Sequence, residues 1–523
     1  MRLLNIAKPI FLIVPAIALV PVGKSLVEGF HTGGVNIIVK FLLAAFQPSI
    51  NRLVIESSFN SLKTTISIAI IAWAISLLNG IFLGVITSNI FTELFKVNLF
   101  WSKILKYSLT VPRAIHEVIW GLLLLQVFGL NPYIAIISIS IPYSALIARV
   151  FAEQINSLDI RSLVASKHSG AGPFETLVTA LTPKIIPIIG TYGGYRLECA
   201  LRGATLLGIF GLGGIGTELT LSIRSLEFNE MWTSLWMLGI ILFFLEKVIT
   251  WIQTPSLYLN NIFNYTITAS ISILILLVVS ILWLNSLDLG ISRSLVFYPI
   301  QLPSIQELIY SFNKLSWASL ISQTICLTLF AAGIAIGLPP ILLSLWPSKL
   351  GEEVISFLWI VCRLIPAPLS ALILLMCSSP SIAVASLALG IQNMGVMGRI
   401  LKESINNKDL AIFNAIKSLG ADKRSAFFYG RICPQSNSYL AYSAYRTDVI
   451  LRETVLVGVV GGSGLGWQLR ESISSFNWSE VILLTATFGI ITLTGELLSD
   501  HLQYYLLKEI KPKQPLLHLK LHS

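Results

Sequence analysis

The chain of 523 residues contains two near copies of one segment, 250 positions apart. Between residues 192–216 and 442–466, ten of 25 aligned positions are identical without a gap. Both copies carry the pattern Tyr-Arg-x-acid-x-x-x-Arg, followed by a glycine-rich turn. The repeated unit is about half of the chain, which is far too long for a solenoid repeat. The sequence therefore predicts two whole domains joined in tandem.

Composition places both domains in a membrane. Hydrophobic residues make up 54% of the chain and charged residues only 12%, whereas a soluble domain carries about 25% charged residues. Five long stretches have no Asp, Glu, Lys or Arg, namely residues 64–92, 118–148, 248–287, 315–348 and 364–398. Since about 20 apolar residues span a bilayer as a helix, we predict an all-α, polytopic membrane protein.

The hydrophobic stretches predict about 12 transmembrane helices, six in each half. In the first half we expect spans near 6–23, 61–87, 108–128, 131–150, 184–209 and 231–250. In the second half we expect spans near 264–284, 318–345, 357–377, 380–399, 436–460 and 481–505. An even number of spans per copy makes the repeat a parallel one.

Charge and register give the predicted domain bounds and orientation. We expect a first domain over 1–255 (core 55–250), a cytoplasmic linker over 256–263, a second domain over 264–510 (core 310–505) and a basic tail over 511–523. The net charge of +10 is attributed to cytoplasmic loops that orient the helices, not to nucleic acid. Both termini are then expected on the cytoplasmic side. A cleaved signal peptide is the alternative for the N-terminus, but no clean cleavage site is visible.

Each copy places three charged residues in an apolar helix. They are Arg196, Glu198 and Arg202 in the first half, and Arg446, Asp448 and Arg452 in the second. Acid and second arginine are four residues apart, so each pair can neutralise itself on one helix face. One interpretation is a purely structural ion pair. The other is that the set lines a translocation path, with one spare arginine per half to meet an anion.

A glycine-rich turn follows each charged helix. Its glycines are Gly211, Gly214 and Gly216 in the first half, and Gly461, Gly464 and Gly466 in the second. The spacing superficially fits a dinucleotide fingerprint, but that motif needs a preceding strand. We interpret both turns as tight external turns near a gate.

The loops after the fourth spans also match. Each is predicted to hold a short helix whose glycine ends it in a left-handed conformation. The residues of interest are Asp159, Ala165, Gly170 and Ala171 in the first half, and Asp409, Ala415, Gly420 and Ala421 in the second. An amphipathic helix in a cytoplasmic loop has an apolar face that needs a partner or the lipid surface.

These loops resemble the coupling loop of importer permeases of the ATP-binding cassette superfamily. The pattern of an alanine, a glycine five residues later and a distal proline is kept (Pro183, Pro434), but Val164 and Asn414 replace the glutamate. The Tyr-Arg-x-acid-x-x-x-Arg pattern and the glycine-rich turn resemble the permease family of phosphonate, phosphite and phosphate-type importers. So does Arg-x-Ile-Pro-Glu-x-x-Trp, which is split here between Arg113-Ala-Ile-His-Glu and Arg363-Leu-Ile-Pro-Ala.

The resemblance implies two tandem type I (MetI-like) transmembrane domains in a bacterial plasma (inner) membrane. It also implies two separate ATPase subunits that dock on the cytoplasmic loops and an extracytoplasmic substrate-binding protein. The chain would then be no enzyme and would carry no cofactor; no metal-ligand spacing or catalytic set is visible. An importer of another small solute and an ion-coupled secondary transporter remain alternatives. A membrane-embedded enzyme is a third, and it would need a catalytic set that the sequence lacks.

Overall fold

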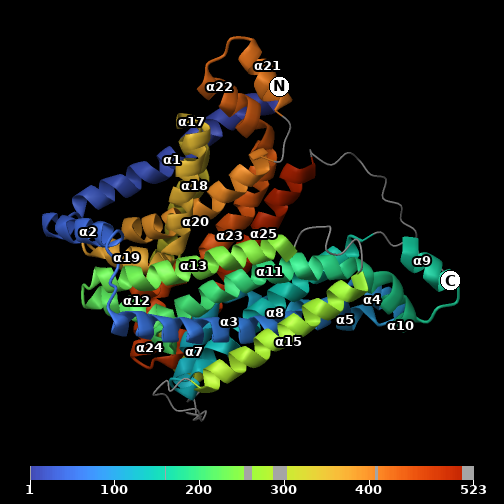
Figure 1. The fold of residues 1–523 in the computed structure, drawn as a ribbon. Helices are drawn as coiled ribbons and strands as arrows, with labels where there is room; N and C mark the ends of the chain where they lie inside the picture. The colour runs from blue at the N-terminus through green and yellow to red at the C-terminus, as the bar shows by residue number, and fades with distance from the viewer. Residues whose placement is uncertain (1, 159–160, 253–261, 287–302, 407–409, 509–523) are drawn as a thin grey trace. The chain divides into compact units, whose positions relative to one another are not determined.

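A computed structural model describes the chain except residues 1, 159–160, 253–261, 287–302, 407–409 and 509–523, and leaves out some side chains, mostly in α1, α11 and α15. Within these described residues the regular structure is helical, and extended pairing is limited to one isolated bridge between Phe30 and Ser378. The all-α prediction is confirmed. Figure 1 shows the helices in chain order.

The first half runs from α1 to α13. Its helices are α1 (Arg2–Glu28), α2 (Thr32–Ala44), α3 (Arg52–Thr87), α4 (Asn89–Leu94), α5 (Leu99–Ser108), α6 (Thr110–Ala114), α7 (Glu117–Phe128), α8 (Pro132–Asn156), α9 (Arg161–His168), α10 (Pro173–Thr176), η1 (Leu177–Leu181), α11 (Thr182–Leu207), η2 (Gly208–Leu212), α12 (Ile215–Arg224) and α13 (Phe228–Ile252).

The second half has a similar order, with breaks at some other positions. Its helices are α15 (Ile262–Ser286), α16 (Ile305–Lys314), α17 (Trp317–Leu345), α18 (Lys349–Leu364), α19 (Ala367–Leu375), α20 (Ile382–Asn406), α21 (Ala411–Ser418), α22 (Lys423–Phe427), η3 (Phe428–Ile432), η4 (Cys433–Gln435), α23 (Ser436–Val460), α24 (Leu465–Ser474) and α25 (Trp478–Lys508). Helices α7, α8, α9 and α12 begin 250 positions before α19, α20, α21 and α24. The register of the sequence repeat is therefore also the register of these helices, and residues 89–94 of α4 correspond to 339–344 at the end of α17.

Ten of the twelve predicted spans meet a length and apolarity test, six as single helices and four as bent pairs. The spans predicted near 6–23 and 264–284 correspond to α1 and α15, whose side chains are described only in part. Both are helical over the expected ranges. The count of about 12 stays a prediction.

Two of the predicted spans are not straight helices. The span near 108–128 bends by 83° before α7, and the span near 357–377 bends by 88° before α19. In both, two successive residues leave the helix for extended backbone, Ile115–His116 and Ile365–Pro366. Proline disfavours a helical residue before it, so Pro366 was a visible signal of the break that the sequence interpretation passed over.

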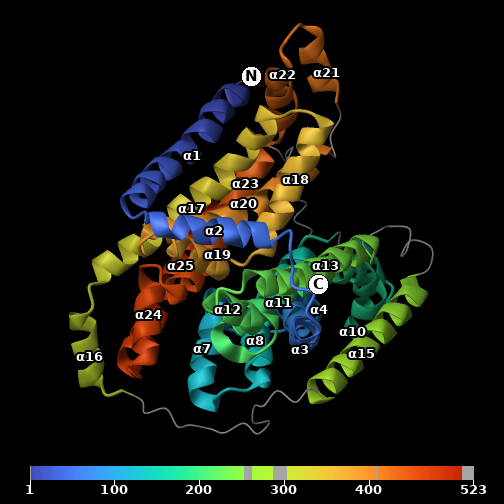
Figure 2. The same cartoon turned by 60° about the vertical axis from the view of Figure 1, so that its left-hand side comes forward.

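The helices form two compact units, which differ from the predicted domains at their edges. Unit 1 combines α1 and most of α2 with α16–α25, and unit 2 contains α3–α15. The predicted cores 55–250 and 310–505 each lie within one unit. Helix α1 runs along α17 (Figure 2), where an added Cβ on Gly333 would lie only 2.6 Å from the Cβ of Ala18. The predicted bounds 1–255 and 264–510 divided the chain in sequence order. In the structure α1 packs on α17 of the second half, and α15 packs on α3 of the first half.

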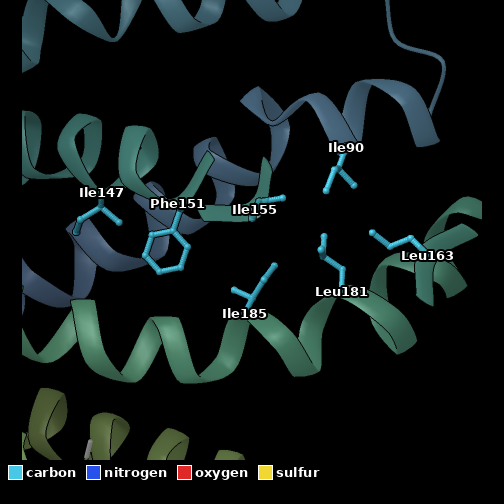
Figure 3. Close-up of a cluster of buried hydrophobic side chains, with 7 residues drawn as sticks. All are labelled: Ile90, Ile147, Phe151, Ile155, Leu163, Leu181 and Ile185. Atoms are coloured by element: carbon cyan, nitrogen blue, oxygen red, sulfur yellow. The ribbon is translucent and has the colours of Figure 1, made fainter. Parts of the chain in front are cut away.

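The core of unit 2 is built around the pair α3 and α8. A Cβ added to Gly80 would lie 2.5 Å from the Cβ of Ile147. A Cβ added to Gly84 would lie 2.7 Å from the Cβ of Phe151, so only glycine permits this close approach of the two helices. The same two side chains belong to a buried cluster (Figure 3) that consists of Ile90, Ile147, Phe151, Ile155, Leu163, Leu181 and Ile185. Leu163 comes from α9, so the cluster also anchors the loop helix.

We expect Gly84→Ala to destabilise the protein by about 1–3 kcal/mol, because the methyl group overpacks the α3–α8 contact. Gly489→Ala is the matched control, since nothing lies within 4 Å of an added Cβ there. In a helix such a change is neutral or stabilising by about 0.5–1 kcal/mol. The free energy of unfolding in detergent, measured by SDS titration, checks both. Equal effects at the two positions would contradict the close packing.

Candidate functional site

The charged helices are α11 and α23, and the predicted ion pairs form. Arg202 Nη2 lies 2.6 Å from Glu198 Oε1, and Arg452 Nη2 lies 2.6 Å from Asp448 Oδ2. Each pair spans one helical turn, which is the spacing that lets two side chains share a face. The ion pair expected from the spacing is therefore present in both halves.

Arg452 has a second carboxylate that the sequence interpretation did not assign to it. Glu496 on α25 places Oε2 3.1 Å from Arg452 Nη2. The side chains of Asp448 and Glu496 are 4% and 7% exposed, so one guanidinium neutralises two buried acids. The sequence contained a signal that this acid has a role, because Glu246 and Glu496 are matching glutamates at the 250-residue spacing.

Arg196 lies among tyrosine rings. Its Nε and Nη2 atoms donate to Tyr192 Oη at 2.7 and 2.5 Å. The guanidinium carbon is 5.0, 5.5 and 5.7 Å from the ring centres of Tyr192, Tyr143 and Tyr195, within the range of cation–π attraction. Tyr143 Oη in turn donates to Glu117 Oε1 at 3.3 Å. The buried arginine of the first half is thus held by aromatic side chains from α8 and α11.

Arg446, its counterpart, has amide and carboxylate partners instead. Its Nε donates to Asn393 Oδ1 at 2.6 Å, and its Nη2 lies 3.3 Å from Glu453 Oε1. Asn393 Nδ2 also donates to Glu453 Oε2 at 2.8 Å, which closes a buried triangle. Arg446 is 8% exposed and Arg196 is 7% exposed.

The second half therefore has no spare arginine of the kind predicted. Its two arginines face three carboxylates, those of Asp448, Glu453 and Glu496. The prediction of a spare arginine considered only the acid inside each Tyr-Arg-x-acid-x-x-x-Arg pattern. The missed ones are Glu453, which sits next to Arg452 in the chain, and Glu496 on another helix. Assignment of these residues to a translocation path remains a prediction.

The bend before α7 is capped by His116. Its Nδ1 accepts from the Val118 N–H at 3.2 Å and lies 3.3 Å from Glu117 Oε2. The histidine thus works as a helix N-cap and a polar packing residue. Glu117 follows in the first turn of α7 and is 8% exposed.

The glycine-rich turns are real breaks in the backbone. Gly211, Gly213 and Gly214 have φ of +95°, +90° and +87°, and Gly461 and Gly464 have φ of +131° and +80°. An L side chain rarely adopts these angles. Gly216 and Gly466 lie instead inside α12 and α24, where a Cβ on Gly216 would lie 2.0 Å from the Thr205 carbonyl oxygen. Those two positions allow close packing rather than the turn itself.

The loop helices also form as predicted. Gly170 and Gly420 end α9 and α21 with φ of +85° and +83°. Ala165 and Ala415 are exposed on these helices, and Ala171 and Ala421 follow the glycines directly. Asp159 and Asp409 lie outside the described residues.

With this geometry established, comparison with known proteins identifies the class. Residues 80–288 match the model of the binding-protein-dependent transport system inner membrane component. The first repeat is a permease domain of this family. Several helices of the second repeat begin 250 residues after their counterparts in the first. The family and the apolar helices make the chain a multi-pass membrane protein. The family comprises membrane components of transporters rather than enzymes.

Three relatives illustrate what the permease is similar to. The phosphate-import permease protein PhnE of Mycolicibacterium smegmatis is 22% identical over 417 residues, which cover 74% of this chain and 76% of the relative. The phosphite transport system permease protein PtxC of Stutzerimonas stutzeri is 29% identical over 119 residues, 23% of this chain and 43% of the relative. A putative cryptic phosphonate transport system permease protein of Escherichia coli is 28% identical over 119 residues, 22% of this chain and 98% of the relative. The chain thus spans less than half of the phosphite relative.

The two loop helices of the permease present different surfaces. On α21 the side chain of Ile412 is 51% exposed, and Leu419 just after the helix is 87% exposed. The equivalent positions of the first half are Ser162 and Ser169. Helix α9 is held by the buried Leu163 and by a 2.7 Å hydrogen bond from Lys184 Nζ to Ser162 Oγ, whereas α21 has no buried residue. An unpartnered apolar face is therefore found on the second loop helix.

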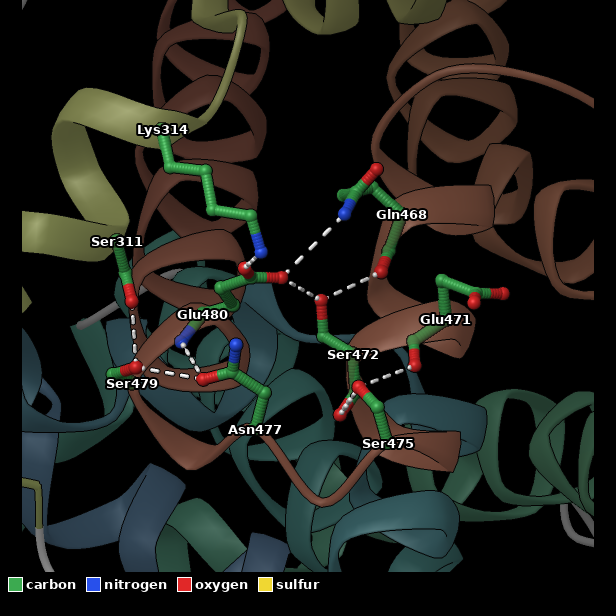
Figure 4. A network of polar contacts seen from close by, with 9 residues as sticks. All are labelled: Ser311, Lys314, Gln468, Glu471, Ser472, Ser475, Asn477, Ser479 and Glu480. Atoms are coloured by element: carbon green, nitrogen blue, oxygen red, sulfur yellow. Dashed lines mark hydrogen bonds and ion pairs between the residues drawn. The ribbon is translucent and has the colours of Figure 1, made fainter.

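A polar network braces the glycine turn of the second repeat (Figure 4). Glu480 on α25 accepts from Ser472 Oγ on α24 at 2.7 Å and pairs with Lys314 Nζ of α16 at 2.9 Å. The hydroxyls of Ser311 and Ser479 are 2.6 Å apart. Three helices of unit 1 are thus joined directly after the turn, which fixes the direction of α24.

The loop of the second repeat contains a titratable cap. Asp422 Oδ2 accepts from the N–H groups of Arg424 and Ser425 at 3.1 and 3.2 Å, as N-cap of α22. The hydrogen bond with the Ser425 side chain, and then those with the backbone, lower the pKa of the carboxyl from its ordinary value.

We expect the start of α22 to loosen in acid. Because the pKa is lower in the folded loop, the cap stabilises it above the unfolded pKa of about 3.9 and loses this effect as the pH falls through the folded value. Protection factors for hydrogen exchange of the Arg424 and Ser425 amides should drop over that interval. Asp422→Asn keeps a good N-cap without a titrating group, so its protection should not depend on pH. Protection that changes equally in both proteins would rule out Asp422 as the cause.

Proposed function

We propose that the chain is a transmembrane component of an ATP-driven importer for a phosphorus oxyanion. A phosphonate is the first candidate substrate, with phosphite and phosphate next. Transport would proceed by alternating access and would need no cofactor on the chain itself, because separate ATPase subunits use the ATP. Both termini would lie on the cytoplasmic side of a bacterial plasma membrane.

The duplicated loop helix is the observation that carries this proposal. A helix of eight residues, ended by a left-handed glycine, occurs in both repeats at the same register and projects exposed side chains. Two such helices suit two copies of an ATPase, and the family's name implies a binding protein as the further partner. Rotation of the loops by the ATPases would alternate access to the path.

The substrate class is supported by the relatives and by the arginines. The relatives are named for phosphate, phosphite and phosphonate. Each repeat of this chain places two arginines in the helix where a path is predicted, and one of each two is buried. Guanidinium is suited to oxyanions because its parallel N–H groups bind two oxygens at once. The predicted path residues are those of α11 and α23, and the external turns after them are the predicted gate.

Uptake of a labelled phosphonate tests the proposal. Cells or vesicles that contain the transporter are depleted of ATP while the proton gradient is kept, with phosphite and phosphate as competitors. We expect uptake to collapse without ATP and one competitor to block it. Uptake that follows the gradient and ignores ATP would overturn the proposal in favour of a secondary transporter. ATP-dependent uptake of an unrelated solute would retain the importer and remove the oxyanion.

A further inference from the structure

Three matched positions around the buried arginines differ between the repeats. Glu117 of α7 corresponds to Ala367, Tyr143 of α8 to Asn393, and Gly203 of α11 to Glu453, each at a spacing of 250. Each repeat therefore has one glutamate in this set, but on a different helix. The arginine beside it, Arg196 or Arg446, is the same in both.

The two glutamates occupy the same place. A Cβ added to Gly203 would lie 3.3 Å from Glu117 Oε1 and 3.5 Å from Tyr143 Oη. A side chain that started at position 203 would thus enter the space that the Glu117 carboxylate fills. In the second repeat Glu453 starts from the equivalent position and binds Asn393, the counterpart of Tyr143.

The bonding is equivalent as well. Glu117 Oε1 accepts from Tyr143 Oη, whose ring lies against Arg196. Glu453 accepts from Asn393 and also pairs directly with Arg446. In both repeats a carboxylate is tied to the side chain of the fourth span that contacts the arginine.

We infer that Glu117 and Glu453 are one positioning carboxylate, supplied by α7 in the first repeat and by α23 in the second. It fixes the guanidinium of its repeat, through Tyr143 in the first and directly in the second. The two origins exclude each other, because two carboxylates in one buried place repel. The long Tyr143 accompanies Gly203, and the short Asn393 accompanies Glu453, which keeps the space filled.

One consequence concerns the broken spans. The carboxylate of the first repeat ties the segment after the bend, α7, to α8 and α11. In the second repeat it lies on the same helix as its arginine, and α19 offers Ala367 at the matching position. The two bent spans are therefore attached to the arginine clusters by different chemistry.

An exchange experiment in the full chain tests the inference. Variants are Glu117→Ala, Gly203→Glu, and the triple change Glu117→Ala, Tyr143→Asn, Gly203→Glu, which transplants the second repeat's set into the first. The thermal midpoint in detergent is measured for each, so the result does not depend on the substrate. ATP-driven uptake is measured as KM and maximal rate, with Glu117→Gln as the variant that keeps the shape and removes the charge.

We expect each single variant to lower the maximal rate about tenfold or more, since each unbalances a buried charge, and to lower the midpoint. The triple variant should have a higher maximal rate and a higher thermal midpoint than the worse of the two single variants. A triple variant that is worse than both single variants would overturn the inference, as would a Gly203→Glu variant that behaves like the unmodified chain. If the triple variant regains its thermal midpoint but no oxyanion is taken up by any form, the fault lies with the proposed function and not with the shared carboxylate.

Discussion

Replacing Arg452 with alanine should destabilise the protein by about 3–5 kcal/mol, the usual cost of removing one partner from a buried ion pair. Its guanidinium contacts Asp448 and Glu496, whose side chains are 4% and 7% exposed. Without it, two carboxylates remain close together in a buried site. The free energy of unfolding by SDS titration in detergent gives the change directly.

Arg202→Ala is the matched control in the first repeat. Arg202 and Glu198 have side chains 25% and 13% exposed, so water screens the acid that is left behind. We therefore expect a smaller loss than at Arg452. A loss at Arg202 equal to or larger than that at Arg452 would show that the Glu496 contact adds nothing to the cluster.

The second large effect is expected on ATPase binding, from changes to the two exposed apolar residues of the second loop helix. Ile412 lies in α21, and Leu419 follows it directly. Ile412→Asp with Leu419→Asp should abolish co-purification of an ATPase and ATP-driven uptake. Burying such side chains stabilises an interface by about 1.5–3 kcal/mol each, so losing both reduces affinity by a factor above about 100. Both residues are more than half exposed, so the fold of unit 1 should not change.

Ser162→Asp with Ser169→Asp provides the control at the equivalent positions of α9. Because those positions are already polar, we expect a clearly weaker effect on ATPase binding. Full uptake by the Ile412→Asp, Leu419→Asp variant would refute the docking assignment for α21. Equal damage by both pairs would mean that the two loops dock alike despite their different surfaces.

The repeats have diverged most where their charges meet. A permease assembled from two identical chains would have two equal arginine clusters. The first repeat combines three tyrosines with the carboxylates of Glu117 and Glu198. The second combines an asparagine with the carboxylates of Asp448, Glu453 and Glu496. If the two clusters line the proposed path, we expect them to contribute unequally to substrate affinity, and the exchange variants above make that difference measurable.

Much of this molecule could be predicted from its sequence. Apolar segments about 20 residues long admit only helices in lipid, because the backbone must satisfy its own hydrogen bonds there, and the 250-residue register located equivalent helices to within a few residues. The pairs Glu198–Arg202 and Asp448–Arg452 followed from helix periodicity alone. The left-handed Gly170 and Gly420 followed from the pattern that ends a helix.

Tertiary structure alone decided the rest. The packing of α1 on α17 and the approach of Glu496 to Arg452 bring together residues far apart in the chain, and helix periodicity says nothing about such contacts. The same holds for Glu117 and Gly203, which are 86 positions apart and share one small volume. A sequence shows which charges a segment contains, but the balance of a buried cluster depends on which helices converge on it.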